Sequence, residues 1–345
     1  MKYIYKIVTF LAMVWVTTGI SKCTSIAHRA KKIPAKMHNI LEQKQIISDL
    51  KKAIKEGDEL KVEALFKKHK IDPNLQTSVL FLNGIYGMIH PLYMTILYRT
   101  KTKNSEKKEG YLKIIKFLLK NKADPSLAVK NPPGSFIEYP LTLATWKKDV
   151  PVVQLLLDHG ANVNQLDINY DDNSPDYDGA LHAAMKNGDM DILNILLKNP
   201  NIDVNLPASR GMLPLQAGIY GYKYGPKGNQ IEAVKLLLAN PKTEINKEDR
   251  NNKNASLNVA VDFGCIEIVE SLVKKEGIDM EHKGFCNRTP LGQAVHNGNV
   301  EIVKLLLKHG ANPKAISIKN ALLSKLGFGK HKEIKKLLKE AKQNS

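Results

Sequence analysis

Residues 164–179 (NQLDINYDDNSPDYDG) hold the densest group of side chains that could bind a metal ion. Asp167 and Asp171 are spaced as in the first half of a calcium-binding loop, and Asp178 falls at the twelfth position. The central glycine that such a loop needs for its sharp turn is replaced by Asp172, and the final glutamate is replaced by aspartate. The pattern disfavours calcium, so we expect no metal and no other cofactor here.

The same stretch fits a protein-recognition hairpin better. Its acidic and aromatic side chains stand out in a chain whose formal net charge is +18. Tyrosine gives a large contact area at a low cost in conformational entropy. We therefore predict that Tyr170, Asp171, Asp172 and Tyr177 contact a partner.

A second tyrosine group lies in residues 220–229 (YGYKYGPKGN), where Tyr220, Tyr222 and Tyr224 alternate with Gly and Lys. The glycines indicate an extended turn, so we expect a second contact site on that turn or packing against its own neighbours. Aromatic residues interleaved with lysine also occur on single-stranded nucleic-acid platforms. A third polar insertion, residues 99–110 (RTKTKNSEKKEG), is expected to be a solvated loop.

Motifs for catalysis are absent from the sequence. It has no Walker loop, no GxSxG elbow, no HExxH helix and no paired cysteines at zinc spacing. His159 and His309 fall at predicted helix C-termini, where partial positive charge suits the helix dipole. We predict that the protein is not an enzyme and has no small-molecule substrate.

The elements that position these residues come from one pattern, which occurs eight times. The last clear copy begins at Thr289 (TPLGQAVHNGNVEIVKLLLKHGANP). Thr289 can cap a helix and Pro290 fits the first helical position, while Gly298 and Gly310 can end the two helices in the left-handed conformation. Equivalent apolar positions in the second helix mark the copies: Val62, Ile115, Val153, Leu193, Val234, Val269, Val303 and, in the last copy, Lys335.

This pattern resembles the ankyrin repeat, whose period is about 33 residues. The resemblance covers residues 45–345 and implies an all-α solenoid of about eight stacked helix-turn-helix repeats with projecting hairpin loops. His182 matches the family's histidine, which implies a structural role in the loop hydrogen-bond network. Lys335 sits in the last copy, as expected of a cap that faces water. The resemblance also implies a concave face for protein binding.

The N-terminal part is different. Lys2 and Lys6 precede an apolar run of about 14 residues, IVTFLAMVWVTTGI, as in a signal peptide. We assign residues 1–22 to a signal peptide or an uncleaved membrane anchor, and residues 23–44 to a basic linker. The basic residues after the run resist translocation under the positive-inside rule.

The three cysteines give weaker expectations. Cys23 stands where a lipoprotein cysteine would, although Lys22 before it is too large, so lipidation at Cys23 is an alternative to an incidental cysteine. Cys265 and Cys286 should lie at opposite ends of a helix about 13 Å long, whereas a disulfide needs Cα atoms within about 7 Å. We expect no bond between them.

The charge gives little support to a nucleic-acid partner. Of the 52 basic residues, 47 are Lys and five are Arg. Proteins that recognise nucleic-acid bases favour Arg, because its guanidinium group makes paired hydrogen bonds to a base. A Lys-, Ile- and Asn-rich composition is typical of an AT-rich genome. The sequence predicts an exported protein-interaction module, periplasmic, membrane-anchored or secreted, resembling those of intracellular bacteria that act on host proteins. A bacterial envelope scaffold, or an anionic-membrane or nucleic-acid binder using Lys-rich ends, remains an alternative; membrane contact is otherwise expected through the N-terminus only.

Overall fold

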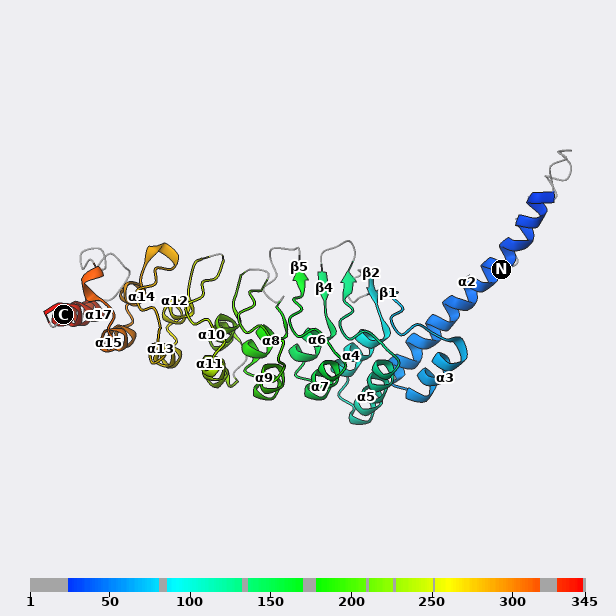
Figure 1. Ribbon diagram of the computed structural model, residues 1–345, viewed down its shortest axis with the longest axis horizontal. Coiled ribbons are helices and arrows are strands. Elements are labelled where there is room, and N and C mark those ends of the chain that lie inside the picture. The colour runs from blue at the N-terminus through cyan, green and yellow to red at the C-terminus, as the bar shows by residue number, and fades with distance from the viewer. Residues whose placement is uncertain are drawn as a thin grey trace.

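A computed structural model describes residues 24–80, 86–131, 136–169, 178–208, 211–225, 228–250, 252–316 and 328–343. Pairs of antiparallel helices stack side by side into an elongated array, with an inner row of helices beneath the hairpins and an outer row on the other side (Figure 1). The prediction of an all-α solenoid of stacked repeats is confirmed.

Seven helix pairs and one terminal helix form the array within these residues. In chain order the pairs are α2 (Thr24–Glu56) with α3 (Glu59–His69), α4 (Pro91–Lys101) with α5 (Ser105–Lys120), α6 (Pro140–Trp146) with α7 (Val150–Asp158), α8 (Ala180–Asn187) with α9 (Met190–Leu197), α10 (Pro214–Tyr224) with α11 (Gln230–Ala239), α12 (Ser256–Asp262) with α13 (Ile266–Val273), and α14 (Pro290–Asn297) with α15 (Val300–Lys308). The last helix is α17 (Phe328–Gln343), and two short 3₁₀ turns are η1 (Phe285–Asn287) and η2 (Pro313–Ala315).

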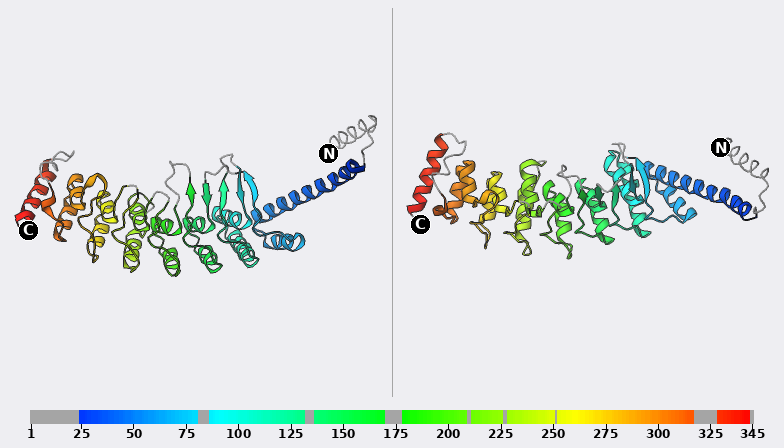
Figure 2. Two further views of the ribbon diagram at one scale, coloured as in Figure 1. Left: turned by 45° about the horizontal axis from the view of Figure 1, so that its top comes forward. Right: turned by 90° about the horizontal axis from the view of Figure 1, so that it is seen from above.

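The hairpins of the first repeats join into one small sheet. Its strands are β1 (Thr77–Leu80), β2 (Tyr86–Ile89), β3 (Val129–Asn131), β4 (Phe136–Glu138) and β5 (Ile168–Asn169). They pair antiparallel in the order β1-β2-β3-β4-β5, so the sheet runs across three successive repeats (Figure 2).

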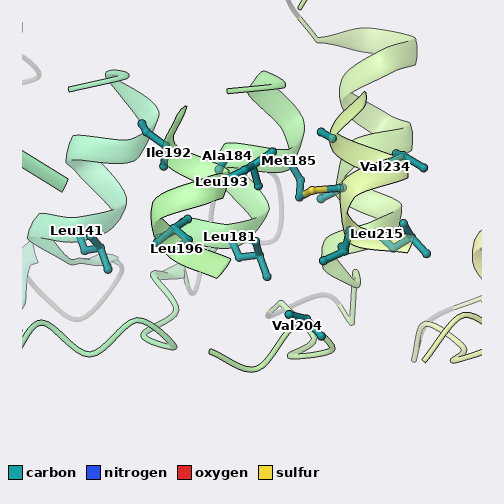
Figure 3. Close-up of a cluster of buried hydrophobic side chains, with 14 of the residues drawn as sticks. Leu141, Leu181, Ala184, Met185, Ile192, Leu193, Leu196, Val204, Leu215 and Val234 are labelled. Carbon is teal, nitrogen blue, oxygen red and sulfur yellow. The ribbon is translucent and has the colours of Figure 1, made fainter. Parts of the chain in front are cut away.

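The core is a continuous seam between helices, built from the apolar stripe of each repeat. Seven marker positions have an exposed fraction of 0%: Val62, Ile115, Val153, Leu193, Val234, Val269 and Val303. Figure 3 shows the middle of the seam, where Met185 lies between Leu181 of its own helix and Leu215 and Val234 of the next repeat. In the last repeat Lys335 is exposed while Ile334 is buried, as expected for a cap.

The caps predicted around Thr289 form as expected. The Thr289 hydroxyl accepts a hydrogen bond from the Gly292 amide at 3.2 Å, and Pro290 occupies the first turn. Gly298 ends α14 at φ 66°, and Gly310 follows α15 at φ 95°. These two positive φ angles lie in the left-handed region that glycine adopts at low cost.

Side-chain amides tie neighbouring hairpins together. Asn164 donates from Nδ2 to the Asn201 carbonyl at 2.7 Å and accepts at Oδ1 from the Asp203 amide at 2.9 Å. The same two bonds are made by Asn205 with Lys242 and Glu244, and by Asn246 with Gly277 and Asp279. Each bond crosses to the next repeat. We call these repeated bonds of Asn164, Asn205 and Asn246 the hairpin ladder, and they fix the distance between neighbouring hairpins.

Two segments differ from expectation. Residues 99–110 were expected to be a solvated loop, but α4 continues to Lys101 and α5 begins at Ser105. Arg99 is buried and binds Asp149 of the next repeat through Nε–Oδ2 at 2.7 Å and Nη2–Oδ1 at 3.2 Å. It also donates to the Lys108 carbonyl, so this arginine joins two repeats.

The N-terminal helix is longer than expected. Residues 23–44 were assigned to a linker, yet α2 is continuous from Thr24 to Glu56. Leu50, Ala53 and Ile54 near its end are buried in the array, whereas its beginning leads away from the other repeats (Figure 1). Residues 1–22 and Cys23 lie outside the described residues. Among those that are described, no helix is long and apolar enough to cross a bilayer.

Candidate protein-interaction surface

Of the segment that holds the first predicted contact group, residues 164–179, only the two ends are described. Tyr170, Asp171, Asp172 and Tyr177 fall outside the described residues. The base closes where β5 pairs with β4 and where Leu166 bridges Gly179.

Buried charged groups lie beneath this hairpin. Asp167 is buried and accepts a hydrogen bond from the Tyr139 amide at 3.0 Å. Asp178 is also buried and pairs with Lys186, whose ammonium lies 5.9 Å from the centre of the Trp146 ring. Together they hold the end of the hairpin against α8.

This environment perturbs two carboxyl groups. Burial raises the pKa of Glu138 to about 7. Burial, followed by the neighbouring charge of Glu138, raises the pKa of Asp167 well above its ordinary value. Both pKa shifts come first from the cost of burying a charged carboxylate away from water, and a like charge adds to the shift only at Asp167. Within the part of the chain that is described, no cluster of His, Cys, Asp and Glu could hold a metal ion.

The second predicted group is placed on a helix, which corrects the expected turn. Tyr220, Tyr222 and Tyr224 lie in the last turns of α10, and the helix ends only at Gly225. Gly221 caused the wrong prediction, because it faces α8 where the two helices approach closely and does not end the helix. A Cβ atom at Gly221 would lie 2.3 Å from the Lys186 carbonyl oxygen.

The tyrosines form an aromatic ridge, defined here as Tyr220, Tyr224 and Phe263. The Phe263 ring, at the end of α12, lies edge-on to Tyr220 at 4.8 Å and to Tyr224 at 5.3 Å between ring centroids. Tyr220 is half-buried, while Tyr224 is 70% exposed. Tyr222 points to a different neighbour, since its hydroxyl donates to Glu267 Oε2 at 2.9 Å. The ridge is therefore a pre-formed aromatic surface between repeats five and six.

A polar cleft adjoins the ridge along the inner helices. Residues of α12, α14 and the next hairpin line it: Asn254, Asn258, Asp262, Phe285, Arg288 and Gln293. Asp262 precedes Phe263 of the ridge and accepts hydrogen bonds from Gln293 at 2.8 Å and Asn297 at 3.3 Å. The cleft and the ridge thus meet at the end of α12, where Asp262 of the cleft is followed by Phe263 of the ridge.

The cleft has an aromatic rim and an unused acceptor. Phe285, at the hairpin tip, is 63% exposed. Asn258 donates from Nδ2 to the His282 carbonyl at 3.0 Å, but its buried Oδ1 has no hydrogen-bond partner. Phe285 was missed from the sequence because nothing in GFCN distinguishes an exposed aromatic residue from a buried one, although the repeat register placed its neighbour Cys286 in a hairpin loop.

The histidines have structural environments. His182 is buried, and its Nε2 lies 3.0 Å from the Met212 carbonyl of the next repeat. Burial lowers the pKa of His182, which favours the neutral ring. His159 caps α7, with Nδ1 at 2.8 Å from the Leu155 carbonyl, and His309 ends α15. Sequence reasoning missed His90, which caps α4 and contacts the Leu127 carbonyl at 2.8 Å.

The two described thiols are free, and one of them is buried. Cys265 is the buried thiol, and Cys286 is exposed. Burial raises the pKa of Cys265 to about 11, which opposes formation of a nucleophilic thiolate.

Comparison with known proteins supports the repeat assignment. The family model "Ankyrin repeats (3 copies)" matches residues 105–208, 141–249 and 224–317. The chain is 28% identical over 174 residues to the nuclear factor NF-kappa-B p105 subunit of Gallus gallus, covering 50% of this chain and 16% of that protein. It is 29% identical over 212 residues to the transient receptor potential cation channel subfamily A member 1 of Homo sapiens, covering 59% and 17%.

A solved structure has the same fold. The ankyrin repeat domain of Bcl-3, a member of the IkappaB protein family, aligns with a TM-score of 0.54 and 18% sequence identity, covering 72% of this chain and 98% of that one. The chain spans about a sixth of the two full-length relatives, so their activities do not transfer with the match.

Proposed function

Because this chain belongs to the ankyrin repeat family, we propose that it binds a protein partner through the hairpin and inner-helix side of repeats five to seven. Ankyrin repeats mediate protein–protein interaction, and their contacts use hairpins and inner helices. The particular surface proposed here consists of the aromatic ridge and the adjoining cleft.

The exposure of two aromatic side chains on this surface carries the proposal. Tyr224 of the ridge and Phe285 of the cleft are exposed by 70% and 63%, and the cleft also holds the charged groups Asp262 and Arg288. Binding hot spots are enriched in aromatic residues and arginine and are surrounded by polar contacts. The stacked core and the hairpin ladder hold these groups in place before binding, which lowers the entropy cost of association.

Site-specific photo-crosslinking tests the proposal. A photoreactive amino acid at position 285 or 224 should capture a partner from cell lysate, whereas the same group at Gln154 should not. Gln154 is exposed on the outer helix α7, so it controls for accessibility alone. Equal capture from all three positions, or capture from 154 only, would place the partner elsewhere.

We further propose that the protein comes from a bacterium that lives in a host cell. The bacterium exports it or tethers it to a membrane, and it acts on a protein of the host. The apolar run after Lys2 and Lys6 supports export, and the Lys-rich composition supports an AT-rich genome. Fractionation of infected cells tests this role: protein in the host cytosol supports it, and protein confined to bacterial membranes instead supports an envelope scaffold.

A further inference from the structure

The outer row of helices changes its charge along the array. Helices α3 and α5, in the two repeats at the N-terminal end, contain eight lysines and four glutamates. The next four outer helices, α7, α9, α11 and α13, contain one lysine and five acidic residues. A general preference for lysine would raise the lysine content of all six helices alike, so it does not explain this separation. The lysines are concentrated at the end of the array from which α2 leads away (Figure 1).

The lysines at this end share one exposed surface. On α3, positions 60, 61, 64, 67 and 68 are exposed and fall on about a third of the helix circumference at about 100° per residue. On α5, positions 113, 116 and 120 are exposed at spacings of three and four, which also places them on one side. The two helices lie side by side, with the Phe66 and Phe117 ring centroids 5.4 Å apart. We call this surface the basic face, and its lysines are Lys61, Lys67, Lys68, Lys113, Lys116 and Lys120.

Half of these lysines carry charge that no nearby acid balances. The other three have a carboxylate oxygen at distances between 2.9 and 3.9 Å. Within the described residues, no carboxylate forms an ion pair with Lys68, Lys116 or Lys120, and all three side chains are exposed. The basic face therefore has a net positive charge that is open to an anionic partner.

An apolar side chain projects from the same surface. Leu60, in the first turn of α3, is 77% exposed, which is the largest exposed fraction among the large apolar side chains of the described residues. Basic groups around an exposed apolar side chain fit the surface of an anionic bilayer, where lysines meet the headgroups and the apolar group enters the acyl boundary. Protein-binding hot spots instead favour Trp, Tyr and Arg, and leucine is under-represented in them.

We propose that the basic face of repeats one and two docks on an anionic phospholipid bilayer, with Leu60 at the headgroup boundary. The acidic outer helices of the next four repeats confine this contact, because they are repelled by the same surface. The array therefore meets the bilayer by its N-terminal end and not along its length. A nucleic-acid duplex lying along the outer row would meet the same acidic helices, and the described residues of the basic face include no exposed aromatic ring or arginine for a base to stack on.

This inference does not rest on the proposed protein partner. The basic face lies on the outer helices of repeats one and two, whereas the ridge and the cleft lie on the hairpin and inner-helix side of repeats five to seven. The inference also differs from attachment by the apolar run near the N-terminus, because it assigns the contact to folded repeats. That run precedes repeat one in the sequence, so attachment by the run would bring the basic face close to the bilayer first.

The experiment places an environment-sensitive NBD fluorophore on the outer row of the full chain. Cys23 and Cys286 are replaced by Ser, buried Cys265 is kept, and a single Cys is introduced as Leu60→Cys. The matched control is Gln154→Cys, at an exposed position of α7 in the acidic part of the row. Vesicles of phosphatidylcholine alone are compared with vesicles of phosphatidylglycerol and phosphatidylcholine at about 3:7. The proposal predicts a blue shift and a gain in NBD emission at position 60 with the anionic vesicles, and little change at position 154.

A charge variant completes the test. Lys68→Gln, Lys116→Gln and Lys120→Gln together in the position-60 protein should weaken the contact on the order of 100-fold, since each lysine near such a surface contributes about a fivefold effect. The emission change should then be lost at the lipid concentration that gives the parent half of its full change. The control variant replaces Lys198, Lys242 and Lys308, which are exposed in repeats four, five and seven, by Gln and should behave nearly as the parent does.

Four results would overturn the proposal. Equal emission changes at positions 60 and 154 would indicate attachment by the N-terminal run or by the whole outer row. Equal changes with the two vesicle types would remove the role of charge. A blue shift at position 60 that grows with protein concentration without vesicles would identify a second copy as the occupant. A larger change with duplex DNA than with anionic vesicles would identify nucleic acid instead.

Discussion

Replacing Gly221 by alanine should destabilise the array, although alanine is the better helix former. The new Cβ atom would lie 2.3 Å from the Lys186 carbonyl oxygen and 2.6 Å from its Cα atom. Both are backbone atoms of α8, so no side-chain rotation relieves the contact and the two helices must separate. Helix propensity contributes about 1 kcal/mol in favour of alanine, and overpacking costs about 1–3 kcal/mol or more at a rigid contact. The difference is about 0–2 kcal/mol, and because the contact is with rigid backbone we expect a net loss at the upper end, about 2 kcal/mol.

Equilibrium unfolding in urea, followed by far-ultraviolet circular dichroism, measures this loss. The matched control is Gly292→Ala, also within a helix, where the new Cβ would lie 3.4 Å from Ile316 Cδ1 and Thr289 Oγ1. There the propensity gain should appear with only slight crowding, leaving stability unchanged or up to about 1 kcal/mol higher. If Gly221→Ala were as stable as Gly292→Ala, α8 and α10 would not be in contact at this point. A separation of α8 and α10 would also move the aromatic ridge, so the variant should bind its partner more weakly.

Three further predictions concern the core, the buried carboxyl and the acidic hairpin. Leu306→Ala should cost about 2–5 kcal/mol because Leu306 is fully buried, whereas Lys101→Ala should stay within about 0.5 kcal/mol of the parent; equal urea midpoints would contradict the register. Glu138 holds a proton in the folded state between its ordinary pKa of 4.5 and about 7, so its contribution to stability falls as pH rises through that window. Glu138→Gln should therefore gain in melting temperature relative to the parent between pH 5 and pH 8, and a constant difference would show that Glu138 is not protonated there. Tyr170→Ala combined with Tyr177→Ala should weaken partner binding by about 2 kcal/mol in calorimetry with melting unchanged, and intact affinity would remove that hairpin from the site.

The repeats could be predicted because their signal is local and repeated. The second helix of seven of the eight copies places an apolar residue at the marker position, and all seven residues are fully buried. The caps at Thr289 and Gly298 follow from backbone requirements that only a few residue types meet. Errors in single copies do not accumulate, because each repeat contacts mainly its neighbours.

The features that failed prediction depend on contacts between repeats. Arg99 appeared to begin a solvated loop because its partner Asp149 lies 50 residues along the chain. Gly221 appeared to end a helix. A glycine that ends a helix cannot be distinguished, from the sequence alone, from a glycine that lets two helices pack closely. Phe285 gave no signal for a similar reason: its exposure depends on the path of a hairpin relative to α12 and α14.

The ridge arises from a difference in helix length between neighbouring repeats. Inner helix α10 has 11 residues, whereas α8 before it has eight and α12 after it has seven. Hydrogen bonds across the hairpins and the buried seam hold the repeats in register, so the extra turn of α10 extends past its neighbours instead of being absorbed. Tyr224 lies at the end of that turn and is exposed except where Phe263 supports it. A partner that binds the ridge would therefore distinguish this repeat from its two neighbours by an extra helical turn, although all three repeats share the same core.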